Sequence, residues 1–262
     1  MTLTRRRFGA ATLAAGLCAL AGPGRAGEPA PTVAAAADLR YALEEIAAAF
    51  AAGTGLRVRL SFGSTGNFAR QIREGAPFEM FMAADESFVL DLARDGLTRD
   101  EGRLYAIGRV AIAVPKSGSP LAPDGTLEDL RAALAEGRVT RFAIANPEHA
   151  PYGRRAREAL EHAGIWEAVR PLLVLGENVS QAAQFALSGS TDGGIIAWSL
   201  ARSPQLAPQG RFGLIPADWH QPLLQRMALM RDAGPVAEAF FAHVQQPAAR
   251  AILARYGFAL PD

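Results

Sequence analysis

The chain has 262 residues, of which half are hydrophobic and 20% are charged, and its formal net charge is +1. A chain of this length and apolar content can bury a core large enough for two lobes. The near-neutral balance excludes the strongly basic surface that nucleic-acid binding requires, so no nucleic-acid partner is expected.

Residues 1–26 have the pattern of an export signal peptide. Arg5, Arg6 and Arg7 precede an apolar run over residues 9–21, which is too short to cross a bilayer as a resident helix, and small residues follow it. The adjacent arginines followed by Phe8 favour a twin-arginine signal over an ordinary secretory one. Four of the 27 basic residues and none of the 26 acidic ones lie here, so the remaining chain would carry a net charge of −3. We therefore expect an exported, periplasmic protein.

Cys18 is the single cysteine, and it lies inside the predicted signal. The processed protein should therefore have no disulfide, no thiol nucleophile and no thiolate metal site. The residues before Cys18, Ala-Gly-Leu, are a poor signal for lipid attachment. This favours a soluble product over a lipoprotein.

From Thr32 onward, short apolar runs alternate with segments of helical periodicity, which is typical of an α/β fold with mainly parallel strands. In the first half of the chain we predict strands at 32–36, 56–62, 78–83 and 105–114, and helices at 39–53, 68–74 and 88–95. The long apolar strand 105–114 is a candidate for the crossing into a second lobe.

The same alternation begins again after Pro120. Here we predict strands at 142–145, 171–175, 194–197 and 225–230, and helices at 127–135, 154–163, 181–187, 236–244 and 247–256. Because strand 225–230 runs back, the first lobe is expected to comprise residues 32–108 plus 226–262. The second lobe would comprise residues 109–225.

A loop of small or polar residues joins a strand to a helix at four places: Ala37-Asp38, Ser64-Thr65, Tyr152-Gly153 and Asn178-Val179. In open α/β sheets, ligands bind outside the carboxyl ends of the strands, where such loops meet. Since two loops come from each lobe, we predict a cleft that closes around one small ligand by a hinge motion.

The residues favour a binding protein over an enzyme. The four histidines (His149, His162, His220 and His243) fall in separate segments, and no nucleophile elbow or phosphate-loop motif is present. The starts of helices instead offer free NH groups with partial positive charge, which suit a tetrahedral dianion. Roughly six such donors, less desolvation, could provide on the order of 10 kcal/mol, which corresponds to sub-micromolar affinity.

Five segments carry a resemblance to a known family: VAAAADLRYALEEIAAAF, SFGSTGNFARQIREGAPFEMFMAADE, NPEHAPYGRRAREALEHAG, GENVSQAAQFALSG and PAARAILARYGF. In this order they resemble the periplasmic molybdate-binding proteins of ABC transporters, from about Val33 to Phe258. The resemblance implies a two-lobed type II periplasmic binding protein that captures molybdate or tungstate and delivers it to a membrane permease. It also implies a monomer without cofactor, which holds the anion through its oxygens and supplies no direct metal ligand.

Carried over residue by residue, the family's oxyanion-binding positions fall at Ala37, Asp38, Ser64, Thr65, Tyr152 and Val179, the last through its main-chain NH. From the residues alone, Ser64 could also serve only as a helix cap, and Tyr152 could be a surface tyrosine. The family commonly has Ser, Thr or Asn in the first loop, so Ala37-Asp38 departs from its pattern.

Two interpretations of Asp38 are open. A carboxylate within about 4–5 Å of a dianion would lower affinity on the order of a hundredfold. We therefore favour Asp38 as a helix N-cap that accepts the NH of Arg40 or Tyr41, with its own NH in the cleft. If the carboxylate faces the ligand instead, a protonated oxyanion becomes a candidate.

Other functions remain possible at this point. The ligand could be another small oxyanion, such as sulfate or phosphate, or a chelated ferric ion, although the latter usually needs several tyrosines. A ligand-sensing regulatory module is a candidate of a different class. The predicted export signal and the lack of a segment for a DNA-binding domain argue against it.

Overall fold

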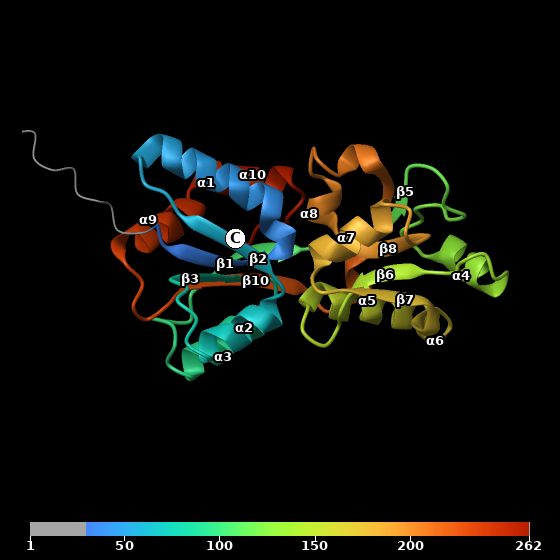
Figure 1. Ribbon diagram of the computed structural model, residues 1–262, viewed down its shortest axis with the longest axis horizontal. Helices are drawn as coiled ribbons and strands as arrows, with labels where there is room; N and C mark the ends of the chain where they lie inside the picture. Colours follow the sequence, from blue (N-terminus) through green and yellow to red (C-terminus); the bar gives the residue numbers. More distant parts are fainter. Residues whose placement is uncertain (1–29, 262) are drawn as a thin grey trace, which may run out of the picture.

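The computed structural model describes residues 30–261, which form two five-stranded sheets flanked by helices (Figure 1). The predicted signal peptide and Cys18 lie outside these residues. We call each sheet with its helices a lobe. No helix within residues 30–261 combines the length and apolar character needed to span a bilayer.

The sheet of the first lobe has the strand order β2-β1-β3-β10-β4. Its strands are β2 (Arg59–Gly63), β1 (Thr32–Ala36), β3 (Met80–Ala83), β10 (Leu223–Leu229) and β4 (Arg103–Gly108). Strand β1 pairs in parallel with β2 and β3, whereas β10 is antiparallel to β3 and β4. The carboxyl ends of β1, β2 and β3 therefore lie at one edge.

Five helices cover the two faces of this sheet: α1 (Arg40–Thr54), α9 (Pro235–Val244), α10 (Pro247–Arg255), α2 (Thr65–Arg73) and α3 (Glu86–Arg94). Helices α1, α9 and α10 lie on one face and α2 and α3 on the other (Figure 1). In α1, Leu43, Ile46 and Phe50 recur at helical spacing, so they lie on one face of the helix. This apolar face is buried against the sheet, and its burial stabilises the helix.

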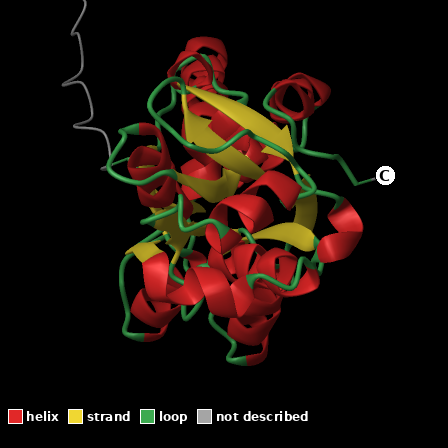
Figure 2. Cartoon of the chain, turned by 90° about the vertical axis from the view of Figure 1, so that its right-hand side faces the viewer, coloured by secondary structure: helices red, strands yellow, loops and turns green. Residues whose placement is uncertain are grey.

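The sheet of the second lobe has the order β7-β6-β8-β5-β9. Its strands are β7 (Leu173–Gly176), β6 (Phe142–Ala145), β8 (Gly193–Ala197), β5 (Val110–Pro115) and β9 (Gly210–Leu214). Its helices are α4 (Glu128–Ala135), α5 (Pro151–His162), α6 (Trp166–Val169), α7 (Val179–Leu187) and α8 (Trp198–Ala201). Seen from the end of this lobe, the helices enclose the strands (Figure 2). The predicted fold class is confirmed.

The single strand predicted at 105–114 is wrong. Two strands occupy this stretch, β4 in the first sheet and β5 in the second, and the chain crosses between the lobes at Arg109. A side chain at Gly108 would collide with the hydroxyl of Tyr152, so glycine is needed for the close approach at this crossing. The chain returns between β9 and β10. The predicted lobe boundaries, at 108/109 and 225/226, stay a prediction.

Several helices begin earlier than periodicity predicts. The helices predicted from residues 68, 154 and 181 begin at Thr65, Pro151 and Val179. Their first turns therefore include the residues of the predicted loops. As a result, the free NH groups at each helix start lie directly after a strand end, between the two lobes.

Candidate functional site

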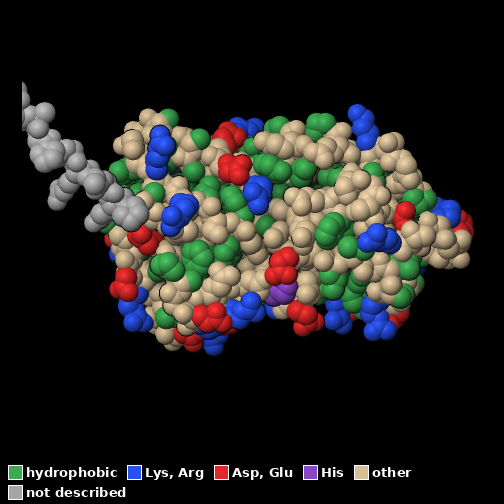
Figure 3. Space-filling view, viewed as in Figure 1, with side chains coloured by type: hydrophobic (Ala, Val, Ile, Leu, Met, Phe, Trp, Pro, Cys, Tyr) green, Lys and Arg blue, Asp and Glu red, His purple; other side chains and the backbone are tan. Residues whose placement is uncertain are grey.

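The four predicted loops meet between the lobes and line one cavity, with about 190 Å³ of empty space between its lining residues. Its lining residues are Ala36, Ala37, Asp38, Gly63, Ser64, Thr65, Ala84, Ala150, Pro151, Tyr152, Asn178 and Val179. All six residues expected to bind the oxyanion are among them. On the face drawn in Figure 3 the lobes meet without a wide opening, which is consistent with a closed site.

Two of the helices that point their starts at the cavity carry side-chain caps. Ser64 caps α2 by accepting the NH of Asn67 at 3.4 Å. Asn178 caps α7 by accepting the NH groups of Ser180 and Gln181 at 3.0 and 3.1 Å. This cap leaves out the NH of Val179, the first residue of α7. That NH group is a donor at the positive end of the helix.

The hydroxyl groups of Ser64 and Thr65 are buried and have different partners. Ser64 Oγ lies 2.9 Å from Nδ1 of His149 in the second lobe, so this serine contacts the opposite lobe in addition to capping α2. Thr65 Oγ1 accepts the NH of Ala84 at 3.0 Å. Because a hydroxyl can accept and donate at once, the proton of Thr65 is available for a ligand in the cavity.

The favoured prediction for Asp38, a helix cap, is wrong. A short 3-10 helix, Ala37–Leu39, precedes α1 and includes Asp38, and no side chain caps either helix start. The carboxylate instead points across the cleft. Its Oδ2 accepts the Tyr152 hydroxyl at 2.9 Å and Nε2 of Gln225 at 2.6 Å.

Burial controls the charge of Asp38. Loss of water raises the pKa of its carboxyl group from 3.8 to about 6, although the hydrogen bonds from Gln225 and Tyr152 oppose the shift. Its other oxygen, Oδ1, is buried and has no hydrogen-bond partner within the described residues. The site thus contains a carboxyl group that titrates near neutrality and has one unused acceptor.

Tyr152 is a buried residue, so the alternative of a surface tyrosine is wrong. Burial and the neighbouring Asp38 raise the pKa of Tyr152 well above 10, so its hydroxyl stays protonated and donates to Asp38. In this arrangement the hydroxyl proton already has an acceptor. A ligand would have to compete with Asp38 for it.

Three residues that complete the site were not predicted. Gln225 lies on β10 and is fully buried, and its Oε1 accepts the hydroxyl of Tyr105 at 2.8 Å, which fixes its amide so that Nε2 faces Asp38. Ser180 and Ser199 donate to the main-chain oxygens of Ala37 and Asp38, both at 2.8 Å. The available signal was Gln225, which together with Arg226 interrupts the apolar residues of β10.

Contacts at the opposite rim also join the lobes. The NH of Gly66 donates to the carbonyl of His149 at 2.9 Å, and a side-chain carbon at Gly66 would come within 2.6 Å of that carbonyl oxygen. Arg155 forms an ion pair with Asp85 at 2.9 Å. The described structure is therefore the closed arrangement of the two lobes.

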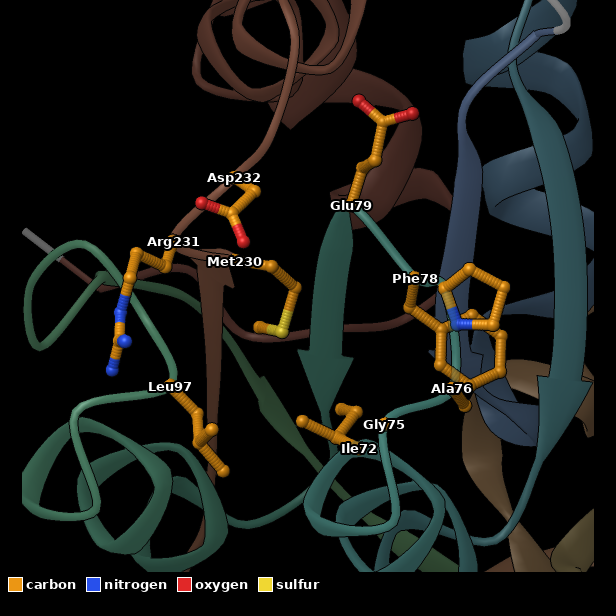
Figure 4. Close-up of a pocket in the computed structure, with 10 residues that line it drawn as sticks. Ile72, Gly75, Ala76, Phe78, Glu79, Leu97, Met230, Arg231 and Asp232 are labelled. Atoms are coloured by element: carbon orange, nitrogen blue, oxygen red, sulfur yellow. The ribbon is translucent and has the colours of Figure 1, made fainter.

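A second hollow lies at the other end of the first sheet and is open to solvent (Figure 4). Glu79 and Asp232 border it together with Arg231, just before β3 and just after β10. It shares no residue with the cavity between the lobes, and its mixed charges do not suit an anion. Within residues 30–261, no group of three or more His, Cys, Asp or Glu residues could hold a metal ion.

Comparison with known proteins places the chain among solute-binding proteins. A family model described as bacterial extracellular solute-binding protein matches residues 31–259. The molybdate-binding protein ModA of Azotobacter vinelandii is 34% identical over 231 residues, which cover 87% of this chain and 89% of that protein. ModA of Rhodobacter capsulatus is 32% identical, with 96% of each chain covered.

Solved structures agree with this placement. The periplasmic molybdate-binding protein of A. vinelandii matches with a TM-score of 0.79 at 29% identity, over 88% of this chain and 100% of that one. The sulfate-binding protein SubI of Mycobacterium tuberculosis has a TM-score of 0.71 at 18% identity, over 90% of this chain and 88% of its own, and so shares the fold. This chain belongs to the family of bacterial extracellular solute-binding proteins, and within it to the group that contains the molybdate-binding protein ModA.

Proposed function

We propose that this protein captures molybdate between its lobes and delivers it to the membrane permease of an ABC importer. Membership in a solute-binding family confirms the prediction of a binding protein rather than an enzyme. The observation that carries the proposal is the cavity between the lobes, which is lined by helix starts and hydroxyl groups and has no Lys or Arg among its lining residues. Neutral donors from several directions suit a tetrahedral dianion, which presents only acceptors.

The donors we propose are the hydroxyls of Ser64 and Thr65 and the NH groups of Ala37, Asp38 and Val179, while the Tyr152 hydroxyl lines the site and donates to Asp38. Each hydrogen bond to a charged ligand contributes about 1.5–3 kcal/mol, so the set supports sub-micromolar binding after desolvation is subtracted. Tungstate has the same charge and tetrahedral form, and we propose that it also binds. Sulfate is smaller than molybdate, so donors placed to fit molybdate would make longer and weaker hydrogen bonds to sulfate.

Calorimetry and thermal-shift measurements on residues 27–262 test which oxyanion the protein binds. We expect molybdate and tungstate to bind with sub-micromolar Kd and to raise the melting temperature, because a ligand at a hundred times its Kd adds about 2.7 kcal/mol to the stability. Sulfate and phosphate should bind far more weakly. Tighter binding of sulfate or phosphate than of molybdate would refute the assignment.

We further propose that the protein is a monomer and reaches the periplasm by the twin-arginine route. The arginines before Phe8 support this route, and they lie outside the described residues. Fusing residues 1–35 to a reporter that is active only after export as a folded protein provides the test. Replacing Arg5 and Arg6 by lysine should abolish export, and unchanged export would refute the route.

A further inference from the structure

Asp38 is the one acidic residue among the residues that line the cavity. Its side chain is 2% exposed and lines the cavity, and Oδ2 is occupied by Tyr152 and Gln225. Oδ1 is buried without a partner within the described residues. Asp38 therefore brings a carboxyl group with one oxygen lacking a partner to the wall of the cavity.

The groups around Asp38 do not compensate its charge. Tyr152 on α5 and Tyr105 on β4 have pKa values raised well above 10 by burial and by Asp38, so both are neutral. Gln225 on β10 and Ser199 on α8 are uncharged, and the Ser199 hydroxyl donates to the main-chain oxygen of Asp38, not to its carboxylate. None of the causes that set the pKa of Asp38 is a cation. An ionised Asp38 would therefore repel a dianion with little screening by protein groups.

We propose, building on the proposed molybdate function, that the site binds its oxyanion together with one proton, which lies between Oδ1 of Asp38 and a ligand oxygen. The proton comes from solvent through Asp38 or arrives on the ligand as a hydrogen oxyanion. Both routes give the same bound species, and no other bond is made or broken. The shared proton turns a repulsive pair of acceptors into a hydrogen bond. Asp38 thereby selects oxyanions that can be held in this singly protonated arrangement.

The proposal sets the direction of the pH dependence. With a pKa of about 6, Asp38 is half protonated at pH 6 and about one percent protonated at pH 8. Since the protonated form binds the dianion, affinity should fall as pH rises, by roughly fiftyfold between pH 6 and pH 8. A site of fixed NH donors without a titrating carboxyl group would show no such fall.

Asp38→Asn is the informative variant because its geometry is determined. The position that accepts from Tyr152 and Gln225 must be the amide oxygen, so the amide nitrogen takes the place of Oδ1 and can donate to the ligand. We therefore expect this variant to bind molybdate with nearly the same Kd at pH 6 and pH 8. At pH 8 it should bind roughly a hundredfold more tightly than the wild type, of which only about one percent is protonated there.

The experiment is titration calorimetry of residues 27–262 with sodium molybdate at pH 6, 7 and 8, in buffers of different ionisation enthalpy, which counts the protons taken up. The wild type should take up close to one proton when it binds molybdate at pH 8, and Asp38→Asn should take up none. Asp232→Asn is the control, because it replaces an exposed carboxyl group at the outer hollow, and it should match the wild type. Molybdate binding without proton uptake and with a pH-independent Kd would overturn the proposal and leave the molybdate function intact. Failure of both wild type and Asp38→Asn to bind molybdate at any of these pH values would overturn the molybdate function itself.

Discussion

At the scale of single residues, Asp38 links the stability of the ligand-free protein to pH. Its pKa is about 6 when folded and 3.8 in the unfolded reference, so the folded state binds the proton more tightly. For a group with a raised folded pKa, the stabilising contribution is complete below the unfolded pKa and is lost as pH rises through the folded pKa. Because of Asp38, the ligand-free protein is therefore less stable above pH 6 than it is at acidic pH.

Replacing Asp38 by Asn should remove this loss. Between pH 4.5 and pH 8, the unfolding free energy of Asp38→Asn should gain about 2 kcal/mol relative to that of the wild type, from the difference between the two pKa values. Urea denaturation without ligand at both pH values measures the change. The Asp232→Asn control should leave the pH profile of the wild type unaltered. A constant difference between Asp38→Asn and wild type would show that Asp38 is not the titrating group.

Tyr152→Phe should have the complementary effect. Its hydroxyl donates to Asp38 and lowers the pKa of the carboxyl group, so its loss destabilises the ionised form most. We expect a loss of about 1.5–3 kcal/mol of unfolding free energy at pH 8 and a smaller loss at pH 4.5, because hydrogen bonds to charged groups are the stronger ones. In the Asp38→Asn background the loss should be the same at both pH values, and urea denaturation of the four proteins tests this.

At the scale of helices and strands, the sequence predicted most elements but not their limits at the site. Apolar periodicity identifies α2 from Phe68 onward, whereas the start of the helix is set by the cap at Ser64. The break between β4 and β5 at Arg109 was missed because apolar residues continue on both sides of it. Strand β9 was missed because Gly210 and Gly213 weaken its pattern.

For the site, too, the sequence predicted the features that depend on neighbouring residues but not the contacts between distant ones. The loops Ser64-Thr65 and Asn178-Val179 could be found because their polar residues are adjacent in the sequence and precede helices. The contact between Asp38 and Gln225 joins residues 187 positions apart, and no local pattern relates them. A local rule therefore assigned Asp38 to a cap, while tertiary packing directed it to Gln225 and Tyr152.

The start of α2 provides a test of how the elements meet. Gly66 lies in its first turn, and an added methyl group would come 2.6 Å from the carbonyl oxygen of His149. Gly66→Ala should therefore hinder closure at a cost of about 1–3 kcal/mol and weaken molybdate binding by roughly fivefold to 150-fold. The helix itself should tolerate alanine, so the unfolding free energy should not fall by a comparable amount.

Gly53→Ala is the matched control for this variant. Gly53 lies in α1, and no atom approaches within 4 Å of an added methyl group. Alanine should raise the unfolding free energy by about 0.5–1 kcal/mol through helix propensity and leave the Kd for molybdate unchanged. If Gly66→Ala binds as tightly as Gly53→Ala, closure does not require the contact with His149.

At the scale of the whole molecule, capture depends on the balance between open and closed lobes. A ligand that contacts both lobes stabilises the closed form, and any contact that the lobes make without ligand contributes to the same balance. The ion pair between Asp85 and Arg155 is such a contact, with side chains 15% and 11% exposed. Asp85 also caps α3 by accepting the NH of Ser87 at 3.0 Å.

Asp85→Asn separates these two roles, because asparagine is as good a helix cap as aspartate but carries no charge for Arg155. We expect the first lobe to stay folded and closure to weaken by about 1–2 kcal/mol, so that the Kd for molybdate rises roughly fivefold to thirtyfold. Glu86→Gln is the matched control, since Glu86 pairs with Arg226 inside the first lobe at 2.7 Å. Small-angle scattering should give a larger ligand-free radius of gyration for Asp85→Asn than for wild type or Glu86→Gln, and saturating molybdate should remove the difference. Equal radii and equal affinities for all three proteins would mean that the ligand alone holds the lobes together.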